Sequence, residues 1–399
     1  MIEEKMRFLI SASLLLLLGL GACKPTPPSP PDSQGPVTLA IPEKGAYTGA
    51  YIDFGEKEDD VTLEAIEDFE QLVGKHQAIV ASSSYWGEQT FPTANVNIIW
   101  RHGSIPLVFW SPWDEPYGQE CPPDRFALTT VLEGKWDAYI DRWADAACAF
   151  GHPLMVSFAN EMNGTWFPWS GYYYGGGATG TVCPSPLPIP APIIYKDGYP
   201  VPGPPCPRPF MGPETFKKAY RYIVDRVRAR GAHNIQWVFH VTNYSMPQEP
   251  WNFFAEYYPG TDYVDWLGAS IYGEQFDVDP WNKFSLLIEG PYKELCAVDP
   301  QKPLMLAEWG VGEYPKKGSK PEFLREALGS LVSRYPRIKA AVFWHERWQN
   351  PGGYYSNLRA NSSPESLAAY RRGVANPLWL DKPILVPLKA APSPALNKQ

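Results

Sequence analysis

The chain has 399 residues, of which 44% are hydrophobic and 20% charged, so it can bury a sizeable core and is neither disordered nor fibrous. Its formal net charge of -8 and the lack of a long basic run argue against nucleic acid as a main partner. Aromatic residues make up 14% of the chain, a content that suits stacking on sugar faces as well as core packing.

The N-terminal segment predicts an exported, lipid-anchored protein. Lys5 and Arg7 precede an apolar run over residues 8–20, and small residues then lead directly into Cys23. This pattern resembles a bacterial lipoprotein signal over residues 1–22, which implies cleavage before Cys23 and acylation of that residue. The run is too short to cross a bilayer about 30 Å thick. We therefore expect an extracytoplasmic protein of the bacterial cell envelope, held at the membrane by lipid, with residues 23–45 as a proline-rich spacer.

An extracytoplasmic location permits disulfides. Cys183 and Cys206 bracket a proline-rich segment and are the first choice for a bridge. The pairing of Cys121, Cys148 and Cys296 stays open. Cys148 lies in a helical pattern, where a buried thiol is expected.

Short apolar or β-branched runs alternate with amphipathic patterns along the rest of the chain. Strands are expected at residues 50–54, 78–82, 106–110, 153–158, 235–241, 263–272, 303–308 and 340–344. Helices are expected at residues 63–73, 132–150, 213–230 and 321–335. This alternation favours an α/β fold, a (β/α)8 TIM barrel over residues 46–380 followed by a tail at 381–399, because each parallel return needs a crossover. A doubly wound open sheet is the alternative.

Two glutamates follow buried strands of this predicted barrel. Glu161 comes after the fourth strand and Glu308 ends the seventh, and neither strand supplies a charged partner. The active site of such a barrel lies at the carboxyl ends of its strands. Retaining hydrolysis of a glycosidic bond needs two carboxyl groups about 5–5.5 Å apart, one as nucleophile and one as acid and then base. A single such glutamate is more often solvated or a helix cap, but the pair predicts catalysis.

The segment NEMNGTWFPW, from Asn160 to Trp169, resembles the acid/base motif of glycoside hydrolase family 26, and Glu308-Trp309-Gly310 resembles its nucleophile segment. The resemblance runs more loosely over residues 46–370. It implies a retaining endo-β-glycanase acting on β-1,4-mannan, mixed-linkage β-glucan or β-1,3-xylan, with Glu161 as acid/base and Glu308 as nucleophile. Mannanases of the family usually have His where this chain has Asn160, whereas asparagine elsewhere in the clan donates to the sugar 2-hydroxyl. Mannan and β-glucan therefore both remain open.

Aromatic residues near these glutamates are the predicted substrate contacts. Trp166 and Trp169 are expected to wall the site, and Trp344 to floor the subsite where the sugar ring distorts. The resemblance implies that Tyr272 donates its hydroxyl to the nucleophile. Other tryptophans in the strand-end segments fit packing between loops equally well, namely Trp110, Trp113 and Trp309.

No cofactor or metal is expected, because His102, His240 and His345 have no ligand spacing. The long connection after the fourth strand, residues 172–212, carries glycines that suggest a hinge and is predicted to wall one side of the substrate site. The predicted partner is a polysaccharide or oligosaccharide, and a monomer is expected. The competing hypothesis is a surface lipoprotein that captures glycans or other solutes without chemistry.

Overall fold

The computed structural model describes residues 35–114, 124–178, 193–196, 199–202, 210–350 and 352–388. Eight parallel strands close into a barrel, and each neighbour in its strand order is hydrogen-bonded to the next. The circle closes where β11 pairs with β2, Ala340 lying opposite Tyr47. The barrel strands are β2 (Ala46–Ile52), β3 (Ile79–Tyr85), β4 (Ile105–Ser111), β5 (Leu154–Phe158), β8 (Ile235–Thr242), β9 (Trp266–Tyr272), β10 (Leu304–Gly310) and β11 (Ile338–His345). The predicted (β/α)8 barrel is confirmed.

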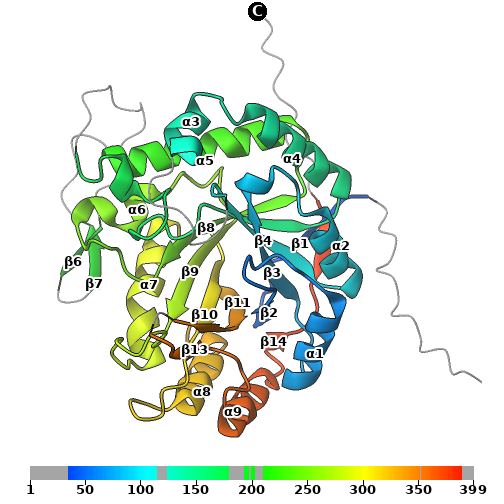
Figure 1. The fold of residues 1–399 in the computed structure, drawn as a ribbon, viewed down its shortest axis with the longest axis vertical. Helices are drawn as coiled ribbons and strands as arrows, with labels where there is room; N and C mark the ends of the chain where they lie inside the picture. The colour runs from blue at the N-terminus through cyan, green and yellow to red at the C-terminus, as the bar shows by residue number, and fades with distance from the viewer. Residues whose placement is uncertain are drawn as a thin grey trace, which may run out of the picture.

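Helices surround the strands, as Figure 1 shows. They are α1 (Leu63–Val73), α2 (Thr93–His102), α3 (Leu128–Leu132), α4 (Asp137–Phe150), α5 (Met211–Ala229), α6 (Phe254–Tyr257), α7 (Phe284–Val298), α8 (Lys320–Leu331) and α9 (Pro364–Val374). Most barrel-strand residues are buried, since one face of each strand packs against helices and the other fills the barrel. Among the described residues, no helix is both long and apolar enough to cross a membrane.

Two element boundaries differ from the sequence prediction for a clear local reason. The first barrel strand begins at Ala46, four residues before the predicted start, because Gly49 hides the strand pattern. A side chain at Gly49 would meet Val342 Cγ2 at 3.0 Å and Ile79 O at 3.1 Å, so the barrel interior has no room for one. The helix predicted from residue 132 begins at Asp137 instead, because Gly134 has a φ of 75° and interrupts the helical path after α3.

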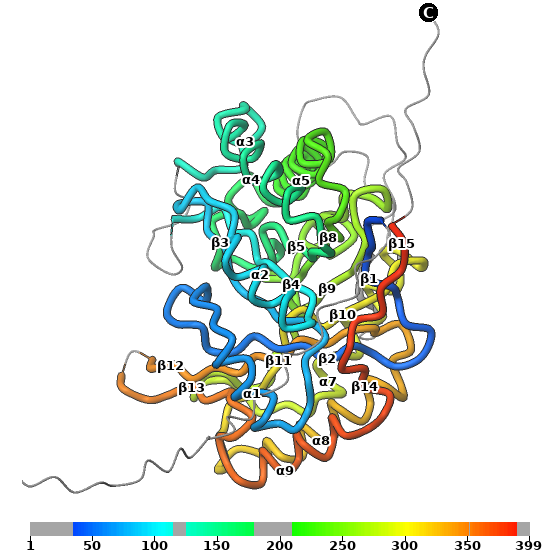
Figure 2. Tube along the Cα trace, turned by 90° about the vertical axis from the view of Figure 1, so that its right-hand side faces the viewer, coloured from blue at the N-terminus to red at the C-terminus, as the bar shows by residue number. Residues whose placement is uncertain are grey.

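Both ends of the described chain extend beyond the predicted 46–380 domain. β1 (Val37–Leu39) and β15 (Leu385–Pro387) pair antiparallel and lie side by side in Figure 2. Short strands also pair as β12 (Arg347–Gln349) with β13 (Tyr355–Asn357) and as β6 (Ile193–Lys196) with β7 (Tyr199–Pro202), while β14 (Trp379–Leu380) pairs with β2.

The connection after β5 lies largely outside the described residues. Its predicted role in walling the substrate site therefore stays a prediction. Its described start forms the short 3-10 helix Gly171–Tyr174. Gly175 and Gly176 have φ values of 90° and 47°. A side chain on Gly177 would meet the Trp251 ring at 2.4 Å. Gly175 and Gly176 therefore allow a left-handed turn. Gly177 allows the backbone to approach the Trp251 ring closely.

α1 and α2 end in the same way, and their ends place side chains used below. Thr62 caps α1 by accepting a hydrogen bond from the Ala65 N–H. α1 then ends at Gly74 and α2 at Gly103, both in the left-handed conformation that closes a helix. These ends lie next to the starts of β3 and β4, opposite the carboxyl ends of the strands.

Candidate active site

Glu161 lies in the turn that follows β5. Ala159 and Glu161 both have positive φ, 49° and 56°, a conformation that side-chain-bearing residues rarely adopt. The turn is held by the Glu161 N–H, which donates to His240 O at 2.7 Å, and by the Gly164 N–H, which donates to Glu161 O at 2.9 Å. Strained backbone that neighbouring contacts hold in place is common where a side chain must be aimed at a reaction.

Glu308 lies on β10, and an irregularity of the strand aims it. Leu306 pairs with Ala269 of β9, but the next paired residue is Glu308, opposite Ser270, so one residue of β10 is extra. A bulge of this kind shifts the in–out alternation of a strand and turns a side chain. The Glu308 carboxylate accepts hydrogen bonds from Tyr272 Oη at 3.0 Å and Asn160 Nδ2 at 3.4 Å.

The two carboxyl groups share neighbours. Ser270 hydrogen-bonds to the Glu161 carboxyl group, and its Oγ lies 2.8 Å from His240 Nε2. That same His240 nitrogen lies 3.9 Å from Glu308 Oε1. The structure therefore brings Glu161 and Glu308 together around Ser270 and His240, two residues that sequence reasoning did not select.

The electrostatics of this pair are set by burial without a cation. Glu161 and Glu308 are 9% and 8% exposed. Burial raises the pKa of Glu161. Burial and the charge of Glu161 raise the pKa of Glu308, while the hydrogen bonds from Tyr272 and Asn160 lower it. Because two close buried carboxylates do not both ionise readily, the pair favours a state that holds one proton.

His240 is a neutral structural member of this group. It is fully buried, and burial lowers its pKa to about 3. Its two ring nitrogens face Ser157 Oγ at 3.1 Å and Ser270 Oγ. The serines therefore fix its orientation without adding charge.

Asn160 and Trp169 form one unit beneath the carboxylates. The Trp169 indole N–H donates to Asn160 O at 2.6 Å, and its ring stacks on Phe167 with centroids 4.6 Å apart. Trp169 is only 1% exposed. The prediction that Trp169 walls the substrate site is therefore corrected: the ring holds the backbone of Asn160 and has no free face for a sugar.

Trp166 and Trp344 both donate hydrogen bonds to glutamates, but Trp166 is exposed whereas Trp344 is 7% exposed. Trp166 is 38% exposed, and its indole N–H donates to Glu161 Oε2 at 2.7 Å. Trp344 lies next to the last residue of β11, stacks on Tyr51 with centroids 4.0 Å apart and donates to Glu346 Oε2 at 2.6 Å. Their roles as sugar contacts stay predictions. Trp110, Trp113 and Trp309, in contrast, are buried in the packing of the barrel and its loops.

Two further carboxyl groups, both partly buried, lie at this end of the barrel. Glu58, in the loop after β2, accepts a hydrogen bond from Ser83 Oγ at 2.7 Å, and burial raises its pKa to about 7. Burial and the charge of Glu58 raise the pKa of Glu346 to about 8. Glu58 stands in the acidic stretch EKEDD directly after the first strand, a signal that could have identified it.

The predicted lipidation site Cys23 and the predicted Cys183–Cys206 bridge lie outside the described residues, as does Cys121. Cys148 and Cys296 are free thiols. Cys148 is exposed, so the prediction of a buried thiol is wrong. Its position on α4 falls on the solvent side, next to the buried Ala147.

Comparisons with known proteins find sequences similar to this chain. A sequence profile described as glycosyl hydrolase family 26 matches residues 131–305, a range that contains Glu161 and stops just before Glu308. An endoglucanase H of Acetivibrio thermocellus is 28% identical over 78% of this chain, and a mannan endo-1,4-beta-mannosidase of Bacillus subtilis is 24% identical over 55% of it. The matches cover 29% and 48% of those two relatives, so the chain spans less than half the length of each.

A solved structure shares the fold. A mannanase from Bacillus subtilis superposes with a TM-score of 0.53 and 17% identity, covering 85% of this chain and 88% of its own. At this identity the likeness concerns the barrel alone.

Proposed function

The chain belongs to glycosyl hydrolase family 26, and on that premise we propose that it is a retaining endo-β-glycanase that cleaves a β-1,4-linked or mixed-linkage polysaccharide. The observation that carries the proposal is the pair Glu161 and Glu308, both buried and gathered around Ser270 and His240. A glycan-capturing protein without chemistry has no need for two buried carboxyl groups that share one proton.

The two carboxyl groups would divide the reaction between them. In the first step the Glu308 carboxylate attacks the anomeric carbon while Glu161 gives its proton to the glycosidic oxygen, so the bond to the leaving sugar breaks and a glycosyl ester forms on Glu308. In the second step Glu161, now ionised, takes a proton from water, and the resulting hydroxide displaces Glu308 at the same carbon. The net proton distribution and the anomeric configuration are restored.

The local hydrogen bonds suit this division. The Tyr272 hydroxyl and the Asn160 amide favour a charged Glu308, which a nucleophile requires. Burial raises the pKa of Glu161, which suits a proton donor. The contacts that lead from Glu161 through Ser270 and His240 to Glu308 support the short separation, about 5–5.5 Å, that retention needs.

Asn160 supports glucan ahead of mannan as the substrate. Its Nδ2 lies 3.4 Å from Glu308 Oε1, so the amide is beside the atom that would bond the anomeric carbon and within reach of the neighbouring 2-hydroxyl. That hydroxyl is equatorial in glucose and axial in mannose, so one amide position cannot serve both equally. The match to the relative named endoglucanase covers more of this chain than the match to the mannosidase does. This difference also favours glucan.

The test is a digest of mixed-linkage β-glucan, mannan, glucomannan and β-1,3-xylan, with products sized and the first-formed anomer identified by NMR. We expect internal cleavage of β-glucan with the β-anomer appearing first and mutarotating later. Initial release of the α-anomer would contradict retention, and cleavage of mannan alone would contradict the substrate choice. Binding of a glycan without any product would favour the capture hypothesis.

The lipid anchor is a separate proposal that rests on the sequence around Cys23. We expect the full-length chain, expressed in a bacterium that processes lipoproteins, to incorporate labelled palmitate and to sediment with membranes. The variant C23S is the control and should do neither. Equal labelling of both proteins would overturn the anchor.

A further inference from the structure

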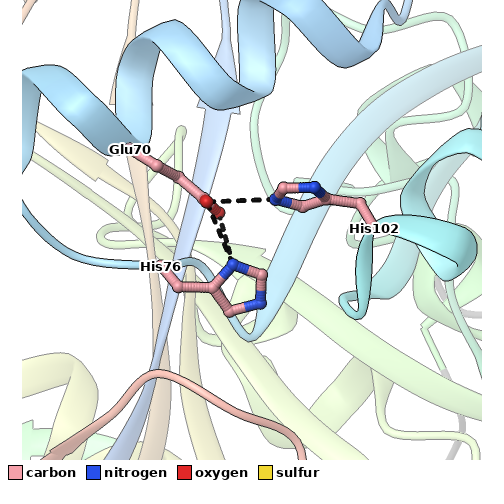
Figure 3. A group of neighbouring side chains, drawn as sticks. All are labelled: Glu70, His76 and His102. Carbon is pink, nitrogen blue, oxygen red and sulfur yellow. Dashed lines mark hydrogen bonds and ion pairs between the residues drawn. The ribbon is translucent and has the colours of Figure 1, made fainter. Parts of the chain in front are cut away.

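Three side chains from different segments meet at the end of the barrel opposite the candidate active site. Glu70 lies on the last turn of α1, His76 in the connection from α1 to β3, and His102 at the last residue of α2. Figure 3 shows both imidazoles turned toward the Glu70 carboxylate. Their candidate ligand atoms all lie within 4.8 Å of one another.

The distances describe a small, closed set of donor atoms. His76 Nδ1 lies 2.9 Å from Glu70 Oε1 and 3.0 Å from Oε2, and His102 Nε2 lies 3.0 Å from Oε2. The three side chains are 14%, 23% and 12% exposed, in the order Glu70, His76 and His102. The group is therefore mostly shielded from water while one side remains accessible.

One ring nitrogen of this group has no hydrogen-bond partner among the described residues. His76 donates one ring N–H to the Gly103 carbonyl, so a neutral His76 would turn its other nitrogen, as a lone pair, toward the Glu70 carboxylate. His102 Nε2 is buried and close to Glu70 Oε2, yet it has no partner of acceptable hydrogen-bond geometry among the described residues. Two imidazole nitrogens and a carboxylate facing one point are arranged as they would be around a cation.

We propose that Glu70, His76 and His102 bind a divalent transition-metal ion of the zinc type. Two imidazole nitrogens and one carboxylate oxygen form a donor set that suits zinc and its neighbours, whereas magnesium and calcium prefer all-oxygen sets. Ligands held at about 2.0–2.1 Å in tetrahedral geometry are about 3.3 Å apart. The spacings between each histidine nitrogen and the Glu70 carboxylate therefore need to widen by only a few tenths of an ångström. Water from the open side completes the coordination.

The surrounding contacts fit the outer shell of such a site. The Gly103 carbonyl accepts the His76 ring proton and fixes the tautomer that leaves Nδ1 free for a metal. The Gln77 N–H donates to Glu70 Oε1 at 2.8 Å, which orients the carboxylate. Both partners are backbone groups of tight helix-to-strand connections.

The role of this metal would be structural. It ties the end of α1 to the end of α2 across the connections that enter β3 and β4. The active site of such a barrel lies at the carboxyl ends of its strands. A metal bound at the opposite end would therefore stabilise the fold and take no part in the reaction. An ion that binds only the folded state at about one hundred times its Kd would raise the melting temperature by roughly 3–6 °C.

The experiment uses the mature chain purified without a histidine tag, stripped with a chelator and titrated with zinc chloride by calorimetry at pH 7.5. We expect one zinc per chain, with affinity at least about 10-fold weaker in H102Q and E70Q. H233Q is the matched control, because His233 is exposed and outside the group. No binding by the wild-type chain, unchanged binding by H102Q, or equal weakening in H233Q would each overturn the proposal.

A second measurement does not depend on any variant folding. Crystals of the wild-type chain soaked in zinc should give an anomalous difference peak between Glu70, His76 and His102. A peak elsewhere, or none, means that the three side chains form only an imidazolium–carboxylate cluster, and this outcome overturns the metal site. Neither result depends on the glycosidase proposal, because neither uses a sugar.

Discussion

The two ends of the barrel use the same residue types in opposite electrostatic settings. At the carboxyl end, Glu161 and Glu308 are buried together, and the nearby His240 is neutral and occupied by serines. At the other end, Glu70 faces two histidines that can carry charge or a metal. The first setting raises glutamate pKa values, whereas the second lowers that of Glu70 to about 2. A glutamate beside an imidazole whose nitrogens already bond to serines keeps a raised pKa and can act as an acid. A glutamate whose carboxylate is itself faced by the imidazole nitrogens has a lowered pKa and can act as an anionic ligand.

The largest effect should come from the carboxyl end. We expect E308Q and E161Q each to lower kcat on β-glucan by at least about 10⁴-fold, because one removes the nucleophile and the other the proton donor. Initial rates on purified variants measure this, with circular dichroism as the folding check. E67Q, on the exposed face of α1, is the control and should keep wild-type turnover. Activity retained in E308Q would show that Glu308 is not the nucleophile and that the carboxyl end of the barrel does not hold a catalytic pair.

Tyr272 tests how the charged state of Glu308 is held. Y272F removes the hydroxyl that donates to Glu308 Oε2 at 3.0 Å, so kcat should fall about 100-fold. That hydrogen bond lowers the pKa of Glu308, so its loss raises it, and the acidic limb of the kcat/KM profile should move to higher pH. A pH–rate profile measures both. A lower rate with an unmoved acidic limb would mean that Tyr272 acts on substrate and not on the nucleophile.

Trp166 tests the acid in the same way with a smaller change. W166F keeps an aromatic ring but loses the N–H that donates to Glu161 Oε2, and kcat should fall about 10-fold. That hydrogen bond lowers the pKa of Glu161, so the alkaline limb of kcat/KM should move to higher pH in the variant. If the acidic limb moved and the alkaline limb did not, the roles of the two carboxyl groups would be reversed.

More of the site residues at the carboxyl end of the barrel than at the opposite end could be predicted from the sequence. Parallel strands make a strong signal, and residues that follow them must meet at one end, so Glu161 and Glu308 could be selected from position. The role of Tyr272 came from the family resemblance. Ser270 and His240 could not, because a serine and a histidine inside apolar strands look like ordinary core residues. Trp169 was misassigned because a tryptophan count does not say which ring face is covered.

The histidine group was missed for a different reason. His102 was judged by its spacing to other histidines along the chain, but its partners come from α1 and the connection after it, and only helix packing brings them together. Metal-ligand motifs can be recognised in a sequence when the ligands lie on one turn or one helix, as in H-x-x-x-H patterns. A site shared between two crossover connections leaves no local pattern.

The smallest effect on activity, and a clear one on stability, is expected for E70Q in the presence of chelator. Burial alone would raise the pKa of Glu70, but the neighbouring imidazoles of His102 and His76 hold it at about 2 instead of 4.5. Its stabilising contribution is therefore present above pH 4.5 and is lost as pH falls toward 2. The pKa of His76 is raised because its hydrogen bond to Glu70 outweighs burial, so its contribution is present below pH 6.5 and is lost as pH rises through the raised value.

The two windows overlap between about pH 4.5 and 6.5, where E70Q should be less stable than wild type by about 2 kcal/mol. Urea unfolding at pH 3, 5.5 and 9 measures the difference, which should shrink at both extremes. E67Q, on the same helix but exposed, should track the wild type at every pH. A deficit of E70Q that stayed constant across pH would show that Glu70 contributes packing and no charge, and the electrostatic contrast between the two ends of the barrel would then rest on the catalytic pair alone.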